Sequence, residues 1–458
     1  MSDAIKSIRE ATREIPVSGE FDVIVAGGGP AGIGAAVAAA RAGAKTLLLE
    51  RYGFLGGMAT AGLVVPHFDC TINLGLNMEL IDRLEKLGGW GAPHWKISFD
   101  PELFKHVSEA MVLESGANIL YHCLAVSPIV EGNEIRGVVV ESKSGRHAFL
   151  GKVVIDSTGD GDIAARAGAP YQIGRDSDGL MQPMTYMFRL GGVDWVQTQG
   201  HELFDLCQKA IEETGDTYRL PYNVPWAIHV PNPREVVLQL VHVRGVDGTD
   251  VWDLTRAEIE GRRQAIEAWR FLKSRVPEFA DSWFIETATQ IGVRETRRIT
   301  GEYTLTVDDV LDGRCFEDGI ANVSFPIDIH DPVDKSQPIQ AVGRRGARPR
   351  GSYQIPYRCL VPLEIQQLLV AGRCISGTHE AHASYRVKGP CLAMGEAAGT
   401  AAALSIREGV PPRQLDTQLL VATLEQNGVR LKLADEANRS KQADSSQQRS
   451  TRPYAGPG

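Results

Sequence analysis

Three stretches near the start of the chain carry the clearest pattern of apolar positions. Residues 21–26 (FDVIVA) and 45–49 (KTLLL) are short apolar runs, and an alanine-rich stretch lies between them at 30–41. Apolar runs of this length are typical of strands buried on both faces of a parallel sheet, and alanine favours helix. The order therefore predicts a β-α-β unit.

Further along, the period of the pattern changes several times. Residues 101–116 have the spacing of an amphipathic helix, and 118–150 form short β-rich stretches separated by turn residues, as in a β-meander. Apolar stretches at 152–156 and 368–371 predict two more buried strands, and the small residues of 389–408 predict a helix. We expect an α/β fold with a Rossmann-like parallel sheet and a meander.

The middle of the chain, residues 175–345, has a different character. It is rich in Trp and Pro, with helices predicted near 200–214 and 255–274 and a strand at 235–243. The second helix is expected to begin with a capping box at Thr255. This segment is predicted to be a second, α+β domain that holds the substrate.

The two ends of the chain and one internal stretch are predicted to be irregular. Residues 1–20 form a charged lead-in without the continuous apolar run of a signal peptide. Residues 337–352, rich in Arg and Gly, are expected to form a loop. Residues 435–458 contain no Ile, Leu, Val, Phe, Met or Trp, so they cannot offset their ordering entropy and should be a disordered tail.

Composition narrows the class of protein. The 458 residues are 43% hydrophobic and 23% charged, which is typical of a globular chain with two or three domains. A net charge of -9 offers no basic surface for nucleic acid, and no apolar run reaches the length of a membrane span. The seven cysteines show no C-x-x-C spacing, which disfavours a zinc or iron–sulfur site. A cytoplasmic protein with reduced thiols is expected.

The strongest motif is Gly27-x-Gly29-x-x-Gly32, which follows the first strand and opens the first helix with Pro30 and Ala31. In a dinucleotide-binding unit the first glycine permits the turn, the second lets a pyrophosphate approach, and the third lets helix and strand pack. Glu50 ends the second strand, where an acid accepts ribose hydroxyl groups and disfavours a 2′-phosphate. A Gly-Gly pair soon after it favours FAD over NAD, because such a loop can lie along an extended cofactor.

The chain resembles the FAD-dependent oxidoreductases with a glutathione-reductase-type flavin fold, distantly similar to fumarate reductase and tricarballylate dehydrogenase flavoproteins. The segments that carry this resemblance are DVIVAGGGPAGIGAAVAAARAGAKTLLLERYGFLGGMAT, VVIDSTGDGDIAARAGA, IGVRETRRITGEYTLT, YQIPYRCLVP and LLVAGRCISGTHEAHASYRVKGPCLAMGEAAGTAAAL. The resemblance implies an FAD domain assembled from residues 21–174 and 346–434, with 175–345 inserted as a substrate domain.

The resemblance also implies which residues hold FAD. Besides the fingerprint and Glu50, these are Arg51, Gly56, Gly57, Met58, Ala59, Val126, Thr158, Gly159, Asp162, Gly372, Arg373, Gly389, Pro390 and Cys391. The last three open a helix whose N-terminus would stabilise negative charge on the reduced pyrimidine ring. The segment after Gly56 lacks the histidine of covalent relatives, so non-covalent FAD is expected, although His67 is near enough in sequence for a covalent link.

Proton transfer needs a titratable group beside the flavin, and residues 379–386 (HEAHASYR) are the richest cluster. They are expected to form a loop between the last strand and the flavin-facing helix, with His379 or His382 handling the proton and Arg386 stabilising negative charge. The same residues could instead only brace the loop, in which case the proton-handling residue would be sought at His67, Tyr353 or His330. Two histidines without a third ligand do not predict a metal.

Arginines outside this cluster leave two interpretations open. Arg294, Arg297 and Arg298 could clamp a substrate carboxylate or form structural ion pairs with Glu295 or Glu302. The basic stretch with Arg344, Arg345, Arg348 and Arg350 could cover the substrate entrance or form a solvated face.

The favoured function is an FAD-dependent dehydrogenase or oxidase that moves a hydride from a small polar organic substrate to flavin N5. One alternative is a flavin monooxygenase or halogenase, although Gly372-Arg373 stands where aromatic hydroxylases have Gly-Asp and residues 226–231 only loosely match a halogenase pattern. The other is a flavin-binding protein without turnover. The substrate, the electron acceptor and any homo-oligomer stay open.

Overall fold

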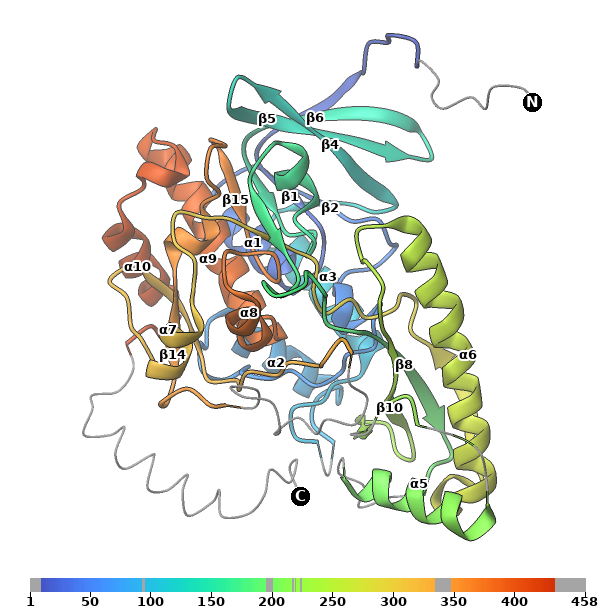
Figure 1. Cartoon of the computed structure of the whole chain (residues 1–458). Helices are drawn as coiled ribbons and strands as arrows, with labels where there is room; N and C mark the ends of the chain where they lie inside the picture. The colour runs from blue at the N-terminus through green and yellow to red at the C-terminus, as the bar shows by residue number, and fades with distance from the viewer. Residues whose placement is uncertain are drawn as a thin grey trace.

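The computed structural model describes residues 10–432, apart from the segments 93–94, 195–200, 216–217, 219, 223–224 and 334–346. Two sheets organise the described residues (Figure 1). A seven-stranded sheet forms the centre of the larger body, and a four-stranded sheet lies beside it against one long helix.

The strands of the central sheet are β1 (Val17–Ala26), β2 (Thr46–Leu49), β3 (Asn118–Leu120), β4 (Cys123–Glu131), β5 (Glu134–Ser142), β6 (Gly145–Asp156) and β15 (Leu368–Val370). Their order is β3-β2-β1-β6-β5-β4, and β15 also pairs with β6. β6 pairs in parallel with β1 and β15 but antiparallel with β5, so the meander grows directly out of the parallel sheet. The predicted α/β fold with a meander is confirmed.

Two strand boundaries differ from the prediction. The stretches expected as separate strands before and after residue 151 form one strand, β6, because residues 145–150 pair with β5, residues 148–156 with β1 and residues 154–156 with β15. β1 begins at Val17, so residues 17–20 are strand instead of lead-in. Their polar side chains are tolerated because this end of β1 is largely exposed while its backbone pairs with β6.

Two helices cross tightly beneath the central sheet: α1 (Pro30–Arg41) and α9 (Lys388–Glu408). A Cβ added at Gly395 would lie 1.9 Å from the carbonyl oxygen of Ala31, and one at Gly399 would lie 2.2 Å from that of Ala35. Only glycine allows this approach of the two backbones. The contact fixes the N-termini of α1 and α9 relative to each other, and both face the site described below.

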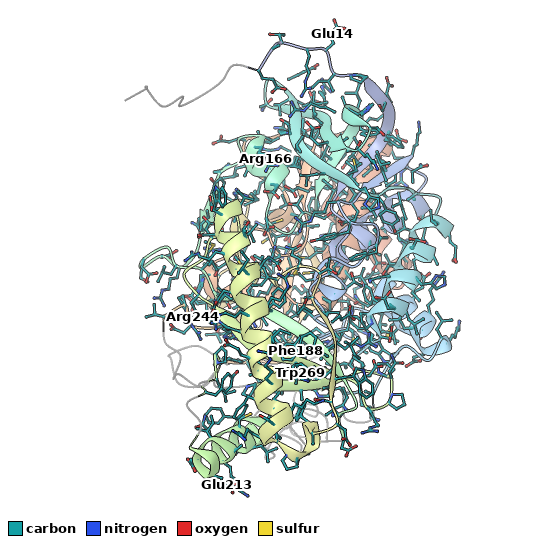
Figure 2. All side chains as sticks on the ribbon, turned by 90° about the vertical axis from the view of Figure 1, so that its right-hand side faces the viewer. Glu14, Arg166, Phe188, Glu213, Arg244 and Trp269 are labelled. Atoms are coloured by element: carbon teal, nitrogen blue, oxygen red, sulfur yellow. The ribbon has the colours of Figure 1, made fainter. Side chains whose placement is uncertain are left out.

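The second sheet consists of β8 (Met184–Gly191), β9 (Trp226–His229), β10 (Val236–Val243) and β11 (Trp283–Thr287), in the order β11-β8-β10-β9. The long helix α6 (Val251–Arg275) covers one face of it, and α5 (His201–Thr214) lies at its end (Figure 1). In the core between the sheet and α6, the ring of Phe284 stacks on Phe188 and meets Trp269 edge-on, with centroids 5.5 Å apart in both pairs. Figure 2 labels Phe188 and Trp269 beside α6.

The remaining elements are η1 (Gly57–Ala59), α2 (Leu76–Lys86), α3 (Pro101–Glu114), α4 (Asp162–Arg166), β7 (Tyr171–Ile173), η2 (Pro277–Phe279), β12 (Arg297–Ile299), α7 (Val307–Asp312), β13 (Gly319–Val323), β14 (Tyr353–Pro356), η3 (Tyr357–Leu360), α8 (His379–Tyr385), η4 (Pro412–Gln414) and α10 (Thr417–Gln426). β7 pairs with β12 and β13 with β14, each in an antiparallel pair.

Two local predictions in this part of the chain were wrong. The capping residue of α6 is Asp250, whose carboxylate accepts the N–H groups of Trp252 and Asp253, so the helix begins before Thr255. Residues 379–385 form the helix α8 instead of a loop, because the Thr378 side chain caps its first turn and the rest of the helix is buried. A helix of seven residues shows too little periodicity to be recognised from sequence.

The predicted domain boundaries stay predictions, and the described residues form two hydrophobic cores, one at each sheet. The core around the second sheet is built from residues 184–293, whereas buried residues of 299–327 belong to the core of the central sheet. The division between the two cores therefore falls inside the predicted segment 175–345. The predicted tail at 435–458 and residues 337–346 of the predicted loop lie outside the described residues. Across the described segments, no helix is both long and apolar enough to cross a membrane.

Candidate active site

A cleft opens at the carboxyl ends of the parallel strands. Gly27 follows β1, Glu50 follows β2, Ser157 follows β6 and Ala371 follows β15, and all four line the cleft. Its empty volume, including the open mouth, is about 1090 Å³. Ligands of open α/β sheets bind at this position, outside the carboxyl ends of the strands.

The glycine fingerprint builds one wall of the cleft. Gly27 has φ +103°, and a Cβ at Gly32 would lie 1.8 Å from the Gly27 carbonyl oxygen. Gly29 differs, because the nearest heavy atom to its added Cβ is the Cα of Gly57, 3.9 Å away. The α1 helix begins at this point without a side-chain cap, so its first N–H groups are available to a ligand. This open cradle at a helix N-terminus fits the pyrophosphate of a dinucleotide.

Glu50 lines the cleft directly after β2. Its carboxylate accepts the backbone N–H of Gly28 at 2.7 Å and that of Tyr52 at 2.9 Å. Burial raises the pKa of Glu50, and these two hydrogen bonds oppose the shift. A carboxylate can accept further bonds, so Glu50 is available to ribose hydroxyl groups. Cys123 to Ala125 of β4 also line the cleft.

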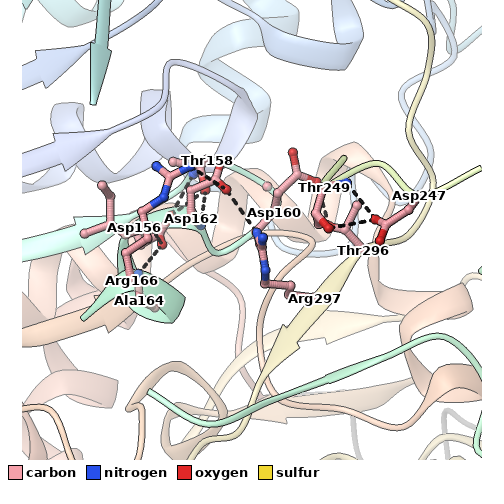
Figure 3. Close-up of polar contacts among 12 residues, drawn as sticks. Asp156, Thr158, Asp160, Asp162, Ala164, Arg166, Asp247, Thr249, Thr296 and Arg297 are labelled. Carbon is pink, nitrogen blue, oxygen red and sulfur yellow. Dashed lines mark hydrogen bonds and ion pairs between the residues drawn. The ribbon is translucent and has the colours of Figure 1, made fainter. Parts of the chain in front are cut away.

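The turn after β6 is held by a buried carboxylate (Figure 3). Asp156 accepts the N–H groups of Ile163 and Ala164 at 2.9 and 2.8 Å, and also the N–H and hydroxyl of Thr158. Burial raises the pKa of Asp156, whereas these bonds stabilise the carboxylate. The bonds cap α4 and turn Thr158 and Gly159 toward the cleft.

Arg373 joins this turn to the end of β15. Its guanidinium lies 2.5 Å from a carboxylate oxygen of Asp160 and donates to the carbonyl of Gly159 at 3.0 Å. Thr296 donates to the same Asp160 oxygen at 2.6 Å (Figure 3). Gly372 has φ +94° and lines the cleft beside Arg373. The middle of the cleft is therefore fixed by contacts between segments more than 200 residues apart.

The end of the cleft at the start of α9 is cationic. Arg386, at the end of α8, donates to the backbone carbonyl of Asp328 at 2.9 Å and to its carboxylate at 3.2 Å. The same carboxylate lies 3.3 Å from Nε2 of His330, and burial together with the charge of Arg294 lowers the pKa of His330 to about 3. Burial also lowers the pKa of Arg386, and the charge of Asp328 opposes that shift.

Lys388 lines the same end of the cleft, one residue before Gly389. It is buried, and its Nζ donates to the carbonyl of Val64 at 2.7 Å. Burial lowers the pKa of Lys388 to about 7. Lys388 was not among the predicted site residues, although its place between Arg386 and the predicted flavin-facing Gly389 was a signal.

The two predicted histidines lie behind the cleft wall and do not line the cleft. Nδ1 of His379 is 2.8 Å from a carboxylate oxygen of Glu295, which also forms a buried ion pair with Arg298. Among the described residues neither ring nitrogen of His382 has a hydrogen-bond partner, and the His382 ring meets Tyr385 edge-on. Burial, together with the charge of Arg298, lowers the pKa of His382 far below 6.5.

Of the other predicted arginines, Arg298 and Arg297 form ion pairs, with Glu295 and Asp162 respectively. Arg294 donates to the carbonyl of Pro183 at 3.1 Å and to the hydroxyl of Thr185, and burial lowers its pKa to about 9. Arg344 and Arg345 lie outside the described residues. His67 and Tyr353 are buried and bonded to Asn77 and Ser384. Within the described ranges, no three His, Cys, Asp or Glu side chains are grouped for a metal ion.

Most predicted FAD-binding residues reach the cleft. Those that line it are Gly27, Gly29, Pro30, Ala31, Glu50, Arg51, Gly57, Met58, Thr158, Gly159, Asp162, Gly372, Arg373 and Cys391, with Arg386 from the catalytic set. Those that do not are Gly32, Gly56, Ala59, Val126, Gly389 and Pro390. Lining residues that the sequence analysis did not name are Gly28, Leu49, Tyr52, Cys123, Leu124, Ala125, Ser157, Asp160, Gln290, Ala371 and Lys388.

Comparison with known proteins bears on the ligand of this cleft. Thiamine thiazole synthase of Methanococcus vannielii is 32% identical over 156 residues, which are 31% of this chain and 56% of that protein. The tRNA uridine 5-carboxymethylaminomethyl modification enzyme MnmG of Alkaliphilus metalliredigens is 31% identical over 31% of this chain and 24% of its own length. The match thus spans about half of the first relative and a quarter of the second.

A solved structure and a family model cover more of the chain. A geranylgeranyl bacteriochlorophyll reductase-like protein from Thermoplasma acidophilum aligns over 89% of this chain and 82% of its own, at 14% identity and a TM-score of 0.43. The family model described as FAD dependent oxidoreductase matches residues 22–424. That match includes every residue that lines the cleft, and the open cradle at Gly29 fits the cofactor. The chain therefore belongs to the FAD-dependent oxidoreductase family, and its cofactor is FAD.

Proposed function

We propose that this protein is a dehydrogenase or oxidase that removes a hydride from a small polar organic substrate, by oxidising a C–OH group or desaturating a CH–CH bond. The observation that carries the proposal is that two cationic side chains, Arg386 and Lys388, line the cleft where α9 begins, and Arg373 lines the same cleft. Such a site favours a substrate that is rich in oxygen atoms, and it stabilises negative charge that develops during oxidation.

Each wall of the cleft then has a role. The open cradle at Gly29 and the carboxylate of Glu50 hold the ADP half of FAD, and Arg373 fixes the turn at Gly159 beside the rest of it. When bound, FAD supplies the acceptor for two electrons. We further propose that FAD is held without a covalent bond, because His67 is fully buried and bonded to Asn77.

Arg386 is the residue that we propose to contact the substrate. Its guanidinium is oriented by two bonds to Asp328, so it is presented to the cleft in one geometry. His379 and His382 were predicted to handle the substrate proton, and their position behind the cleft wall favours a positioning role. His379→Ala and His382→Ala distinguish these roles, since loss of general acid–base help slows reduction about 100-fold or more.

An anaerobic substrate panel tests the function. Acids, sugars and alcohols are mixed with the FAD-loaded protein, and loss of the oxidised flavin absorbance is followed over time. Bleaching by one substrate class alone supports the proposal. Bleaching that needs NADH or NADPH would instead favour a monooxygenase or halogenase, and no bleaching by any compound would favour a flavin-binding protein without turnover. The Arg386→Lys variant then tests the proposed substrate contact, because it keeps the charge and loses the planar fork.

A further inference from the structure

Lys388 is a buried amine that faces the cofactor cleft without an acidic partner. The residue is 7% exposed, and its Nζ donates a single hydrogen bond, to the carbonyl oxygen of Val64. Among the residues that the structure describes, no carboxylate lies within ion-pair distance of it. A buried ammonium normally has a carboxylate partner, because an unpaired buried charge is costly.

The helix that carries Lys388 adds to this cost. Lys388 is the first residue of α9, after the capping position Val387, where the positive end of the helix dipole disfavours a cation. Ordinary helices place acidic residues in this turn. A lysine here gains nothing from local structure, which favours a role in the cleft that it faces.

The groups packed around the amine supply no negative charge. Cys391 lies one turn further along α9, and His67 and Cys70 come from the segment that follows η1. Burial raises the pKa of the Cys70 and Cys391 thiols to about 11 and about 12 and lowers the pKa of His67 to about 3, so all three are neutral at neutral pH. The ring centroid of Phe99 lies 5.7 Å from Nζ, and the other cationic side chains that line the cleft are Arg51, Arg373 and Arg386.

The carbonyl that binds Nζ is itself held in place. Val64 donates its N–H to the carbonyl of Met58 at 3.0 Å, and the preceding residue, Leu63, has φ +51°. A leucine in the left-handed region is strained and persists only where the surroundings enforce it. The strained turn therefore aims one acceptor at the amine and keeps the amine at the cleft wall.

We propose that Lys388 is the proton acceptor of the site and takes up the proton that the substrate loses on oxidation. This proposal rests on the proposed function. When a C–OH group becomes C=O, the C–H bond breaks and its hydrogen and two electrons pass to FAD, while the O–H bond breaks and its proton passes to the amine of Lys388. The resulting ammonium then balances the negative charge that the hydride brings into the cleft.

The proposal predicts a specific proton count, which needs no substrate. The loaded protein is reduced stepwise with dithionite and mediator dyes at several pH values between 7.5 and 9, and the two-electron midpoint potential is recorded. When FAD is reduced by two electrons, the flavin takes up one proton, and Lys388 takes up a second. For a two-electron couple, one proton changes the equilibrium constant tenfold per pH unit, or 29.6 mV. The parent protein should therefore show about 59 mV per pH unit, and Lys388→Met about 30 mV.

Lys273→Met is the matched control. Lys273 also donates to one backbone carbonyl, that of Ser282, and its Nζ lies 5.6 Å from the ring of Trp269, but it belongs to α6, far from the cleft. It should keep the parent slope. Lys388→Gln serves as the second variant, because its amide can still donate to Val64 but does not titrate in this range.

The outcomes separate this proposal from the proposed function. A parent slope of about 30 mV per pH unit would overturn the role of Lys388 even if neither variant folds, and so would equal slopes in the parent and Lys388→Gln. If the slopes differ as expected while no substrate of the panel bleaches the flavin, the function fails and the proton site stands. Where a substrate is found, Lys388→Met should also slow reduction by about 100-fold at pH 8.

Discussion

Replacing Gly29 by alanine should weaken FAD binding without unfolding the protein, whereas the same change at Gly32 should damage the fold. Gly29 has φ -72° and ψ -177°, an extended conformation that alanine adopts without strain. The nearest heavy atom to its added Cβ is 3.9 Å away, so the methyl group would stand in open space in front of α1. That space is where we place the pyrophosphate.

The size of the loss in FAD affinity follows from the hydrogen bonds that Gly29→Ala would remove. A methyl group at this point keeps the phosphate from the first N–H groups of α1, and a hydrogen bond to a charged group contributes about 1.5–3 kcal/mol. Losing one such bond weakens FAD binding about 10- to 150-fold. Stability of the FAD-free protein should stay the same or rise by up to about 1 kcal/mol, because alanine restricts the unfolded chain.

Gly32→Ala is the contrasting variant. Its Cβ would lie 1.8 Å from the Gly27 carbonyl oxygen and 2.9 Å from the Ser157 hydroxyl, so α1 must move away from β1. Overpacking of this kind costs about 1–3 kcal/mol or more. FAD content after gel filtration, FAD affinity by fluorescence titration, and thermal melts of the FAD-free proteins separate the two effects. Unchanged FAD affinity in Gly29→Ala would refute the placement of the cofactor, and a large loss of stability in that variant would refute the steric argument.

Two further predictions concern charge. Burial raises the pKa of Glu396 from 4.5 to about 7, so its contribution to stability is fully present below pH 4.5 and is lost as the pH rises through 7. The free energy of unfolding of Glu396→Gln, measured with urea, should therefore exceed that of the parent by up to about 3 kcal/mol at pH 8 and by little at pH 4.5. Arg386→Lys should retain FAD but reduce it with substrate at least about 10-fold more slowly, because the fork that Asp328 orients is lost; equal rates in stopped-flow experiments would exclude Arg386 from substrate binding.

The parts of the fold that sequence predicts are those in which the signal is local. Residues 30–41 are a helix with the predicted bounds, because proline opens it and alanine fills it. The start of α6 escaped prediction, because the first turn of the helix exposes Val251 and Trp252, which give no amphipathic pattern. The short helix α8 escaped for the same kind of reason: its stability comes from burial and a single cap at Thr378.

The candidate site also has one part that can be predicted from sequence and one part that cannot. The glycines around Gly29 and the acid Glu50 can be recognised because their spacing along the chain reflects one compact unit. The contacts that shape the other end join distant segments, as between Arg373 and Asp160, His379 and Glu295, or Lys388 and Val64. No spacing rule predicts such pairs from sequence. The histidines were therefore predicted from their residue type alone, whereas the residue that lines the cleft is a lysine.

That lysine should cost the protein stability, which gives a last prediction. Burial lowers the pKa of Lys388 from 10.5 to about 7, so the folded state binds the proton more weakly than the unfolded state. The difference corresponds to about 5 kcal/mol, present in full below pH 7 and lost as the pH rises toward 10.5. In the FAD-free protein, Lys388→Met should therefore unfold at higher urea than the parent at pH 6, with a gain that shrinks by pH 9. Lys273→Met should show no such dependence on pH. If Lys388→Met is equally or less stable than the parent at pH 6, burial of the amine does not lower the free energy of unfolding. Its burial would then give no reason to assign Lys388 a role in the chemistry of the cleft.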